Sequence, residues 1–199
     1  MSETITKVPD TTIVLKKSEI RNLDVFELES VSLNANDWLS AGQSEYRLYA
    51  YLSTCFNDSV ILDVGTRVGG SALALSYNEN NRVISYDLVE QGASKIVKDN
   101  IEFKIQDFRE DETLNYDEIS IIMIDVDPHD GVQEVEMMEF LNDKGWKGII
   151  LLDDIGPAWP EVQDMWDAIE DPTIDVTEVG HMSGTGLVNF GSKHTVGWE

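Results

Sequence analysis

Residues 60–71 read VILDVGTRVGGS, a short apolar run that passes into a glycine-rich turn. The run has the length and composition of a buried strand, and Ser71 begins a segment with helical character. Glycine permits a tight turn and a close approach of the backbone to a ligand, and a helix N-terminus behind such a turn favours an anionic group. The stretch predicts the first strand, turn and helix of an α/β sheet with a ligand at the turn; a plain packing turn is the alternative.

Strands and helices alternate beyond this turn. Further strands are expected at Arg82–Asp87, Ile101–Ile105, Ile119–Asp125 and Gly148–Asp153, with helices at Ser71–Ser76, Gly92–Asn100, Gly131–Leu141 and Pro160–Ile169. The last two strands, Ile174–Val179 and Gly186–Phe190, flank turn residues and are expected to pair as an antiparallel hairpin. The order predicts a Rossmann-like, doubly wound α/β fold: a mostly parallel seven-stranded sheet with a C-terminal antiparallel hairpin.

The first 40 residues are weakly patterned, with a short strand expected at Thr12–Leu15 and a polar stretch after it. We interpret residues 1–40 as an N-terminal extension that caps a site or makes a subunit contact, which is compatible with a homodimer. Residues 41–199 form the main domain, which opens with a helix expected at Gln43–Phe56.

The chain is strongly acidic, with 38 acidic and 14 basic residues and a formal net charge of −24. This charge argues against nucleic acid and anionic membranes as partners, because both are bound mainly through Lys and Arg. No stretch approaches the ~18 apolar residues of a membrane span, and the N-terminus lacks the pattern of a signal peptide. The single cysteine, Cys55, cannot form an internal disulfide. These features predict a cytoplasmic protein.

Acidic residues stand at the ends of four predicted strands, namely Asp63, Asp87, Asp125 and the pair Asp153–Asp154. Ligands of open α/β sheets bind outside the carboxyl ends of the strands. Asp87 follows the glycine-rich turn by about 20 residues, where a carboxylate can accept both hydroxyl groups of a ribose. Asp107 and Phe108 follow the third strand, where an adenine is expected: Asp107 can accept the exocyclic amine and Phe108 can pack on the ring. A solvated acid is the alternative for Asp107.

These residues carry a family resemblance that spans about Gln43 to Phe190. DVGTRVGGS is similar to the D/E-x-G-x-x-x-G-x-S pattern of class I S-adenosylmethionine-dependent methyltransferases, with Arg67 where many relatives have glycine. MIDVD at 123–127 and LLDDI at 151–155 resemble the acidic strand ends of the metal-dependent O-methyltransferases of the catechol and macrocin types. The resemblance implies S-adenosylmethionine as cofactor, bound by residues of the turn and by the acids that follow the next two strands. By the resemblance, Asp63, Gly65 and Ser71 hold the methionine portion, Asp87 the ribose and Asp107 the adenine end. Thr66 and Gly69 of the turn and Phe108 after the third strand complete the expected cofactor site.

The same resemblance assigns a metal to Asp125, Asp153 and Asp154. Three neighbouring carboxylates repel one another unless a cation compensates them or one is protonated. Oxygen ligands select a hard cation, Mg²⁺ first, with Ca²⁺ or Mn²⁺ as alternatives. The lone cysteine and the absence of paired histidine spacing argue against zinc. The alternative is that one of Asp153 and Asp154 caps the following helix and that no metal binds.

The catalytic base has to be argued separately from the resemblance, because the lysine that the catechol-type enzymes carry shortly after the fourth strand is missing here. His129 is our first candidate, since imidazole exchanges protons near neutral pH, and Asp127 is the second. The implied reaction is metal-assisted O-methylation of a small hydroxylated acceptor such as a sugar or natural product. One alternative is a methyltransferase-like binding module without activity. The other is a nicotinamide-dependent oxidoreductase, against which the missing Tyr-x-x-x-Lys pair argues.

Overall fold

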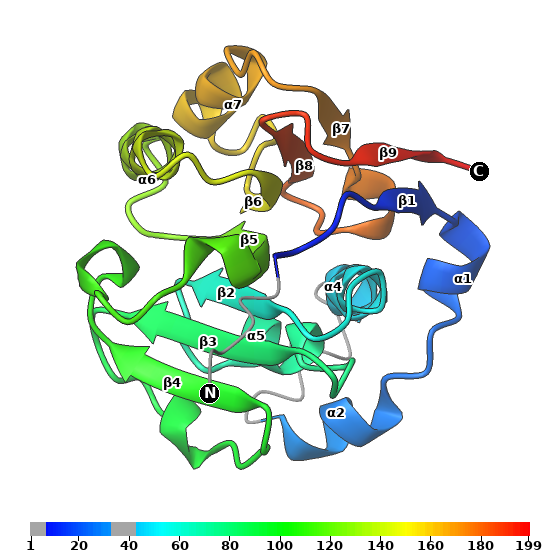
Figure 1. Cartoon of the computed structure of the whole chain (residues 1–199). Helices are drawn as coiled ribbons and strands as arrows, with labels where there is room; N and C mark the ends of the chain where they lie inside the picture. Colours follow the sequence, from blue (N-terminus) through cyan, green and yellow to red (C-terminus); the bar gives the residue numbers. More distant parts are fainter. Residues whose placement is uncertain (1–6, 33–42) are drawn as a thin grey trace.

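The computed structural model describes residues 7–32 and 43–199, and a seven-stranded sheet forms its centre (Figure 1). The strand order is β4-β3-β2-β5-β6-β8-β7. The strands are β2 (Val60–Val64), β3 (Arg82–Asp87), β4 (Ile101–Ile105), β5 (Ile119–Ile124), β6 (Gly148–Asp153), β7 (Thr173–Asp175) and β8 (Thr185–Phe190). β2 pairs in parallel with β3 and β5, whereas β8 runs antiparallel to both β6 and β7. The predicted fold class, including the antiparallel hairpin, is therefore confirmed.

Helices cover both faces of this sheet (Figure 1). They are α4 (Gln43–Ser53), α5 (Gly70–Leu75), α6 (Val132–Asp143) and α7 (Pro160–Asp167), with single 3₁₀ turns η1 (Ala93–Lys95), η2 (Phe108–Glu110), η3 (Tyr116–Glu118) and η4 (Thr177–Val179). Residues of α4 and α5 form one apolar cluster with the sheet, and residues of α6 and α7 form the other. Every residue of β5 is buried between the two layers, which explains its continuous apolar sequence.

The described part of the N-terminal extension packs against the main domain. β1 (Thr12–Leu15) pairs in parallel with β9 (Thr195–Trp198), and α1 (Lys17–Arg21) contacts α4. Leu15 and Ile20 are buried in the same apolar cluster as α4. A second short helix, α2 (Phe26–Val31), follows. The sequence pattern does not predict α1, α2 or β9, because each is short and has little apolar periodicity. A role of the extension as a cap or subunit contact stays a prediction.

The helix predicted at Gly92–Asn100 is wrong. The chain forms only the single turn η1 there, because Gly92 is in a left-handed conformation and Ile96 is already extended. Ala93 and Ile96 are buried and hold this loop against the rest of the domain. The seventh strand is also shorter than predicted, since its second half forms η4. In the described ranges, no helix is both long and apolar enough to pass through a membrane.

Candidate functional site

The glycine-rich turn between β2 and α5 packs directly against the end of β5. Gly65 has φ +103°, and a Cβ atom there would lie 1.6 Å from the carbonyl oxygen of Asp125. The backbone N–H of Gly65 donates to the carbonyl of Tyr86 at 2.9 Å. Only glycine fits this position, and its absence of a side chain brings the turn next to the acidic end of β5.

Gly69 has a packing role in the same turn. It precedes α5 with φ +84°, and its Cβ would lie 2.7 Å from Cδ1 of Ile96. The loop that contains η1 therefore closes against the turn through Ile96. The left-handed φ of Gly69 by itself favours glycine at this position. The predicted contribution of Gly69 to cofactor binding stays a prediction.

Asp63 presents a buried carboxylate beneath the turn. Its Oδ2 accepts a hydrogen bond from Ser85, whose hydroxyl group also bonds to Thr66. Its Oδ1 is buried and has no hydrogen-bond partner within residues 7–32 and 43–199. Burial raises the pKa of Asp63 to about 6, while the hydroxyl groups of Ser85 and Ser71 act in the opposite direction. The site therefore holds a buried carboxylate whose Oδ1 lacks a well-formed hydrogen bond, although the hydroxyl group of Ser71 acts on the same carboxylate.

Asp87 ends β3 at the rim of the turn. One carboxylate oxygen accepts from the backbone N–H of Arg67 at 2.8 Å, and the other accepts from that of Val89 at 3.0 Å. Each oxygen keeps a second lone pair. The carboxylate is thus fixed in orientation and still able to accept from a ligand, as a ribose contact requires.

The side chains of Asp107 and Phe108 lie in different surroundings, although the two residues are adjacent in the chain. Burial raises the pKa of Asp107, but hydrogen bonds and the charge of Arg109 outweigh burial and lower it below its usual value. Phe108 is fully buried and packs edge to face with Tyr86 and with Phe140 on α6. The predicted stacking of an adenine on Phe108 is therefore wrong, because η2 turns the ring into the core.

The acids after β5 and β6 lie at adjacent strand ends. Asp125 follows β5, Asp153 is the last residue of β6, and Asp154 comes next. Burial raises the pKa of Asp125, and the charge of Asp154 raises it further. Burial also raises the pKa of Asp153, with the charge of Glu45 on α4 as the next cause. Both raised pKa values mean that burial and neighbouring acids make the ionised forms of Asp125 and Asp153 unfavourable.

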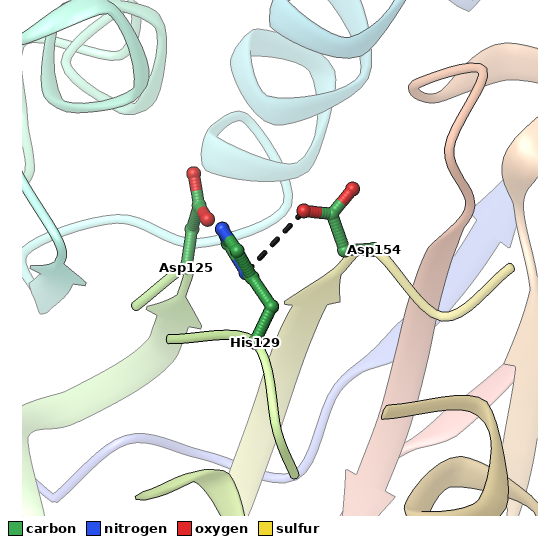
Figure 2. A group of neighbouring side chains, drawn as sticks. All are labelled: Asp125, His129 and Asp154. Carbon is green, nitrogen blue, oxygen red and sulfur yellow. Dashed lines mark ion pairs between the residues drawn. The ribbon is translucent and has the colours of Figure 1, made fainter. Parts of the chain in front are cut away.

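His129 lies between two of these acids. Figure 2 shows its imidazole between the carboxylates of Asp125 and Asp154. Nδ1 lies 3.4 Å from Oδ2 of Asp154, and Nε2 lies 3.3 Å from Oδ1 of Asp127. The ring also packs on Trp159, with centroids 4.5 Å apart. The two residues predicted as candidate bases, His129 and Asp127, are therefore neighbours.

A second histidine, His181, reaches the same edge from the connection between β7 and β8. Its Nδ1 lies 3.7 Å from Oδ2 of Asp153 and also forms a hydrogen bond with the hydroxyl group of Ser183. Two groups of potential metal ligands result in the described part of the chain, Asp125–His129–Asp154 and Asp153–Asp154–His181, each with ligand atoms within 4.8 Å of one another. The three acids predicted as one set are thus divided between two groups that share Asp154. The sequence feature that could have indicated the position of His181 is the glycine-containing turn that follows it, because this turn leads into β8, which runs antiparallel to β6.

Solved structures of methyltransferases share this architecture. A putative caffeoyl-CoA O-methyltransferase from Staphylococcus aureus is 15% identical with a TM-score of 0.61, covering 88% of this chain and 99% of its own. A methyltransferase from Geobacter sulfurreducens is 14% identical with a TM-score of 0.59, covering 83% and 88%. The SAH-bound methyltransferase PaMTH1 from Podospora anserina is 13% identical with a TM-score of 0.50, covering 84% and 97%. No protein-family model and no curated protein matches the chain.

These likenesses define the class of fold. The chain has the Rossmann-like fold found in S-adenosylmethionine-dependent methyltransferases, and the resemblance predicted from its sequence is confirmed at that level.

Proposed function

We propose that this protein is an S-adenosylmethionine-dependent methyltransferase that methylates a hydroxyl group of a small acceptor with the help of a metal ion. The observation that carries the proposal is the geometry of the β2–α5 turn. The buried Oδ1 of Asp63 has no hydrogen-bond partner in the described ranges, and the carboxylate of Asp87 is fixed in orientation. Between them, the backbone at Gly65 has a conformation and a close contact that only glycine allows. The shared fold supports the same location for the cofactor, since ligands of open α/β sheets bind at this edge.

The residues at the turn fit the cofactor by their hydrogen-bonding chemistry. The free oxygen of Asp63 is suited to the amino group of the methionine portion, and Asp87 is suited to the two hydroxyl groups of the ribose. Thr66 and Ser71 contribute hydroxyl groups beside Asp63. Asp107, after β4, remains our proposal for the adenine end. S-Adenosylmethionine supplies a methyl group on a sulfonium, and the protein has to orient an acceptor oxygen toward it.

His129 is the proposed base for that oxygen. It accepts the hydroxyl proton, while Asp127 beside Nε2 orients the ring and stabilises the imidazolium. Asp125, Asp153 and Asp154 are the proposed carboxylate ligands of a hard divalent cation, Mg²⁺ first, which supplies charge stabilisation for the developing alkoxide. Their buried, mutually repelling carboxylates support a cation at this edge.

The acceptor is proposed to be a small hydroxylated molecule rather than nucleic acid or a membrane component. The net charge of −24 supports this choice, because an acidic protein repels polyanions. Trp159 packs on His129 and keeps 36% of its surface exposed, so it offers an apolar wall next to the proposed base. Sugars and aromatic natural products both pack on such a wall.

Calorimetric titration of the full chain with S-adenosylhomocysteine and, separately, with NADH tests the cofactor class. The proposal predicts saturable binding of S-adenosylhomocysteine at one site per chain and no binding of NADH. Binding of NADH alone would contradict it. Turnover of S-adenosylmethionine with hydroxylated acceptors then separates an enzyme from a binding module, and loss of that turnover in excess EDTA is expected if a metal assists.

A further inference from the structure

The Asp153–Asp154–His181 group contains a nitrogen donor that the resemblance to O-methyltransferases does not supply. His181 comes from the C-terminal connection between β7 and β8, far in sequence from the two acids. The register between β6 and β8 explains why His181 lies next to the two acids, because Thr185, the first residue of β8, pairs with Asp153, the last residue of β6. The antiparallel strand therefore begins where its parallel neighbour ends, and the residues before it lie at the site.

The backbone around His181 holds it firmly in place. Gly156 N–H donates to the carbonyl of Ser183 at 2.8 Å, and Gly184 N–H donates to that of His181 at 3.1 Å. A Cβ on Gly156 would lie 2.2 Å from the Ser183 oxygen, and one on Gly184 would lie 2.4 Å from Gly156 N. The backbone N–H of His181 donates to Oγ1 of Thr185 at 2.8 Å. Two glycines thus let the His181 turn pack backbone to backbone on the segment that follows Asp154.

Asp153 supplies an independent sign of a missing ligand. Its side chain is only 8% exposed, and its Oδ1 is buried without a hydrogen-bond partner in the described ranges. Within those ranges, the basic side chains next to the carboxylates of Asp153 and Asp154 are His181 and His129, and no Lys or Arg side chain pairs with either acid. A buried carboxylate oxygen without a donor is costly unless a cation or proton satisfies it.

We propose that Asp153, Asp154 and His181 bind a divalent transition-metal ion, with the imidazole of His181 as the nitrogen ligand. Mg²⁺ prefers all-oxygen surroundings, whereas imidazole together with carboxylates suits Mn²⁺, Fe²⁺, Co²⁺ or Zn²⁺. This assignment deepens the metal-assisted part of the proposed function and rests on it, but it changes the metal class and adds a ligand. It gives no metal-ligand role to His129, whose two nitrogens lie next to the carboxylates of Asp154 and Asp127.

Metal binding by the chelator-treated full chain tests the assignment without any methyl acceptor. Calorimetric titrations with Co²⁺, Mn²⁺ and Mg²⁺ are expected to show Co²⁺ binding at least tenfold tighter than Mg²⁺. His181→Ala should weaken Co²⁺ binding by at least about tenfold, because even the loss of an outer-shell partner of a ligand costs 10–100-fold. Pulsed electron paramagnetic resonance of the Mn²⁺ form should show coupling to an imidazole nitrogen that disappears in His181→Ala.

His129→Ala is the matched control, because it removes the other imidazole at this edge. His129→Ala should keep the coupling to the imidazole nitrogen. Asp153→Asn should weaken Co²⁺ binding as His181→Ala does, and it serves as the test if His181→Ala does not fold. Unchanged metal affinity in folded His181→Ala, a nitrogen signal that instead vanishes in His129→Ala, or Mg²⁺ bound as tightly as Co²⁺ would each overturn the assignment. Failure of the cofactor proposal would appear separately, as absent S-adenosylhomocysteine binding.

Discussion

The carboxyl group of Asp63 is fully buried, and burial raises its pKa to about 6. An aspartate in an unfolded chain has a pKa of about 3.9. Since the folded-state pKa is the higher one, the unfolded state ionises first as the pH rises. The folded state therefore loses stability between about pH 4 and pH 6, and the loss is complete above pH 6.

Asp63→Asn should remove this penalty. We expect the free energy of unfolding of the variant minus that of the parent to rise by about 2–3 kcal/mol between pH 4 and pH 7, because each pKa unit corresponds to about 1.4 kcal/mol. Urea unfolding at several pH values measures it, with exposed Asp99→Asn as the control. If the difference in free energy of unfolding between Asp63→Asn and the parent does not change with pH, the pKa of Asp63 is not raised in the folded protein.

His129 is the residue on which the proposed proton transfer depends. With an acceptor that the parent methylates, His129→Ala should lower kcat by about 10²–10⁴-fold, the usual contribution of a general base. Affinity for S-adenosylhomocysteine should not change. Asp127→Asn should have a smaller effect, because that carboxylate orients the ring at 3.3 Å. A His129→Ala enzyme with the parental rate and pH profile would return the role of base to Asp127 or to metal-bound solvent.

Individual residues differed in how well the sequence predicted them. The acids at strand ends were predictable, because parallel strands bring their carboxyl ends to one edge. Phe108 was not, since a single 3₁₀ turn decides whether its ring faces a ligand or the core. His181 was missed because its neighbours Asp153 and Asp154 are distant in sequence, and only the register between β6 and β8 brings them together.

The turn between β2 and α5 is the element that positions the site. Its contact with the end of β5 depends on the missing side chain at Gly65, where a Cβ would lie 1.6 Å from a backbone oxygen. Backbone atoms cannot move aside as a flexible side chain can. The turn and the acidic end of β5 are therefore coupled, and a change at Gly65 should disturb both.

Gly65→Ala should destabilise the protein by clearly more than the ~1 kcal/mol that a left-handed conformation alone costs a non-glycine residue. Gly145→Ala is the matched control, because Gly145 has φ +68° but nothing lies within 4 Å of its Cβ position. The difference between the two variants reports the contact with β5 together with the larger φ of Gly65. Equal losses in urea unfolding would show that this contact is not tight.

The apolar strands were predictable as elements because burial on both faces leaves a continuous hydrophobic run, as in β5. The segment at 92–100 was not, since it lies against the turn through Ala93 and Ile96 instead of forming a helix. β9 has few apolar residues, and its pairing with β1 spans almost the whole chain. Sequence periodicity carries no signal for such a contact.

At the scale of the whole molecule, the pairing of β1 with β9 joins the two ends of the described chain. β1 contributes alternate residues to the core: Ile13 and Leu15 are buried, whereas Val14 is 39% exposed. α1 adds Ile20 to the same cluster, against α4. The N-terminal segment from residue 7 to residue 32 therefore stabilises the layer formed by α4.

Leu15→Ala should lower the free energy of unfolding by about 2–5 kcal/mol, the usual cost of truncating a fully buried leucine. Val14→Ala, one residue away on the exposed face of the same strand, should cost less than about 1 kcal/mol. Chemical unfolding of both variants measures the contrast. Similar small losses would mean that the segment is not part of the cooperative core.

The central claim is that the edge formed by the glycine-rich turn and Asp87 binds the cofactor. Calorimetric titration of S-adenosylhomocysteine into the parent, Asp87→Ala and the control Asp143→Ala tests it most directly, since Asp143 ends α6 at the opposite edge of the sheet. We predict that Asp87→Ala binds about 5- to 150-fold more weakly, equivalent to the ~1–3 kcal/mol of a lost charged hydrogen-bond partner. Asp143→Ala should bind as the parent does. Unchanged affinity in folded Asp87→Ala would contradict the account.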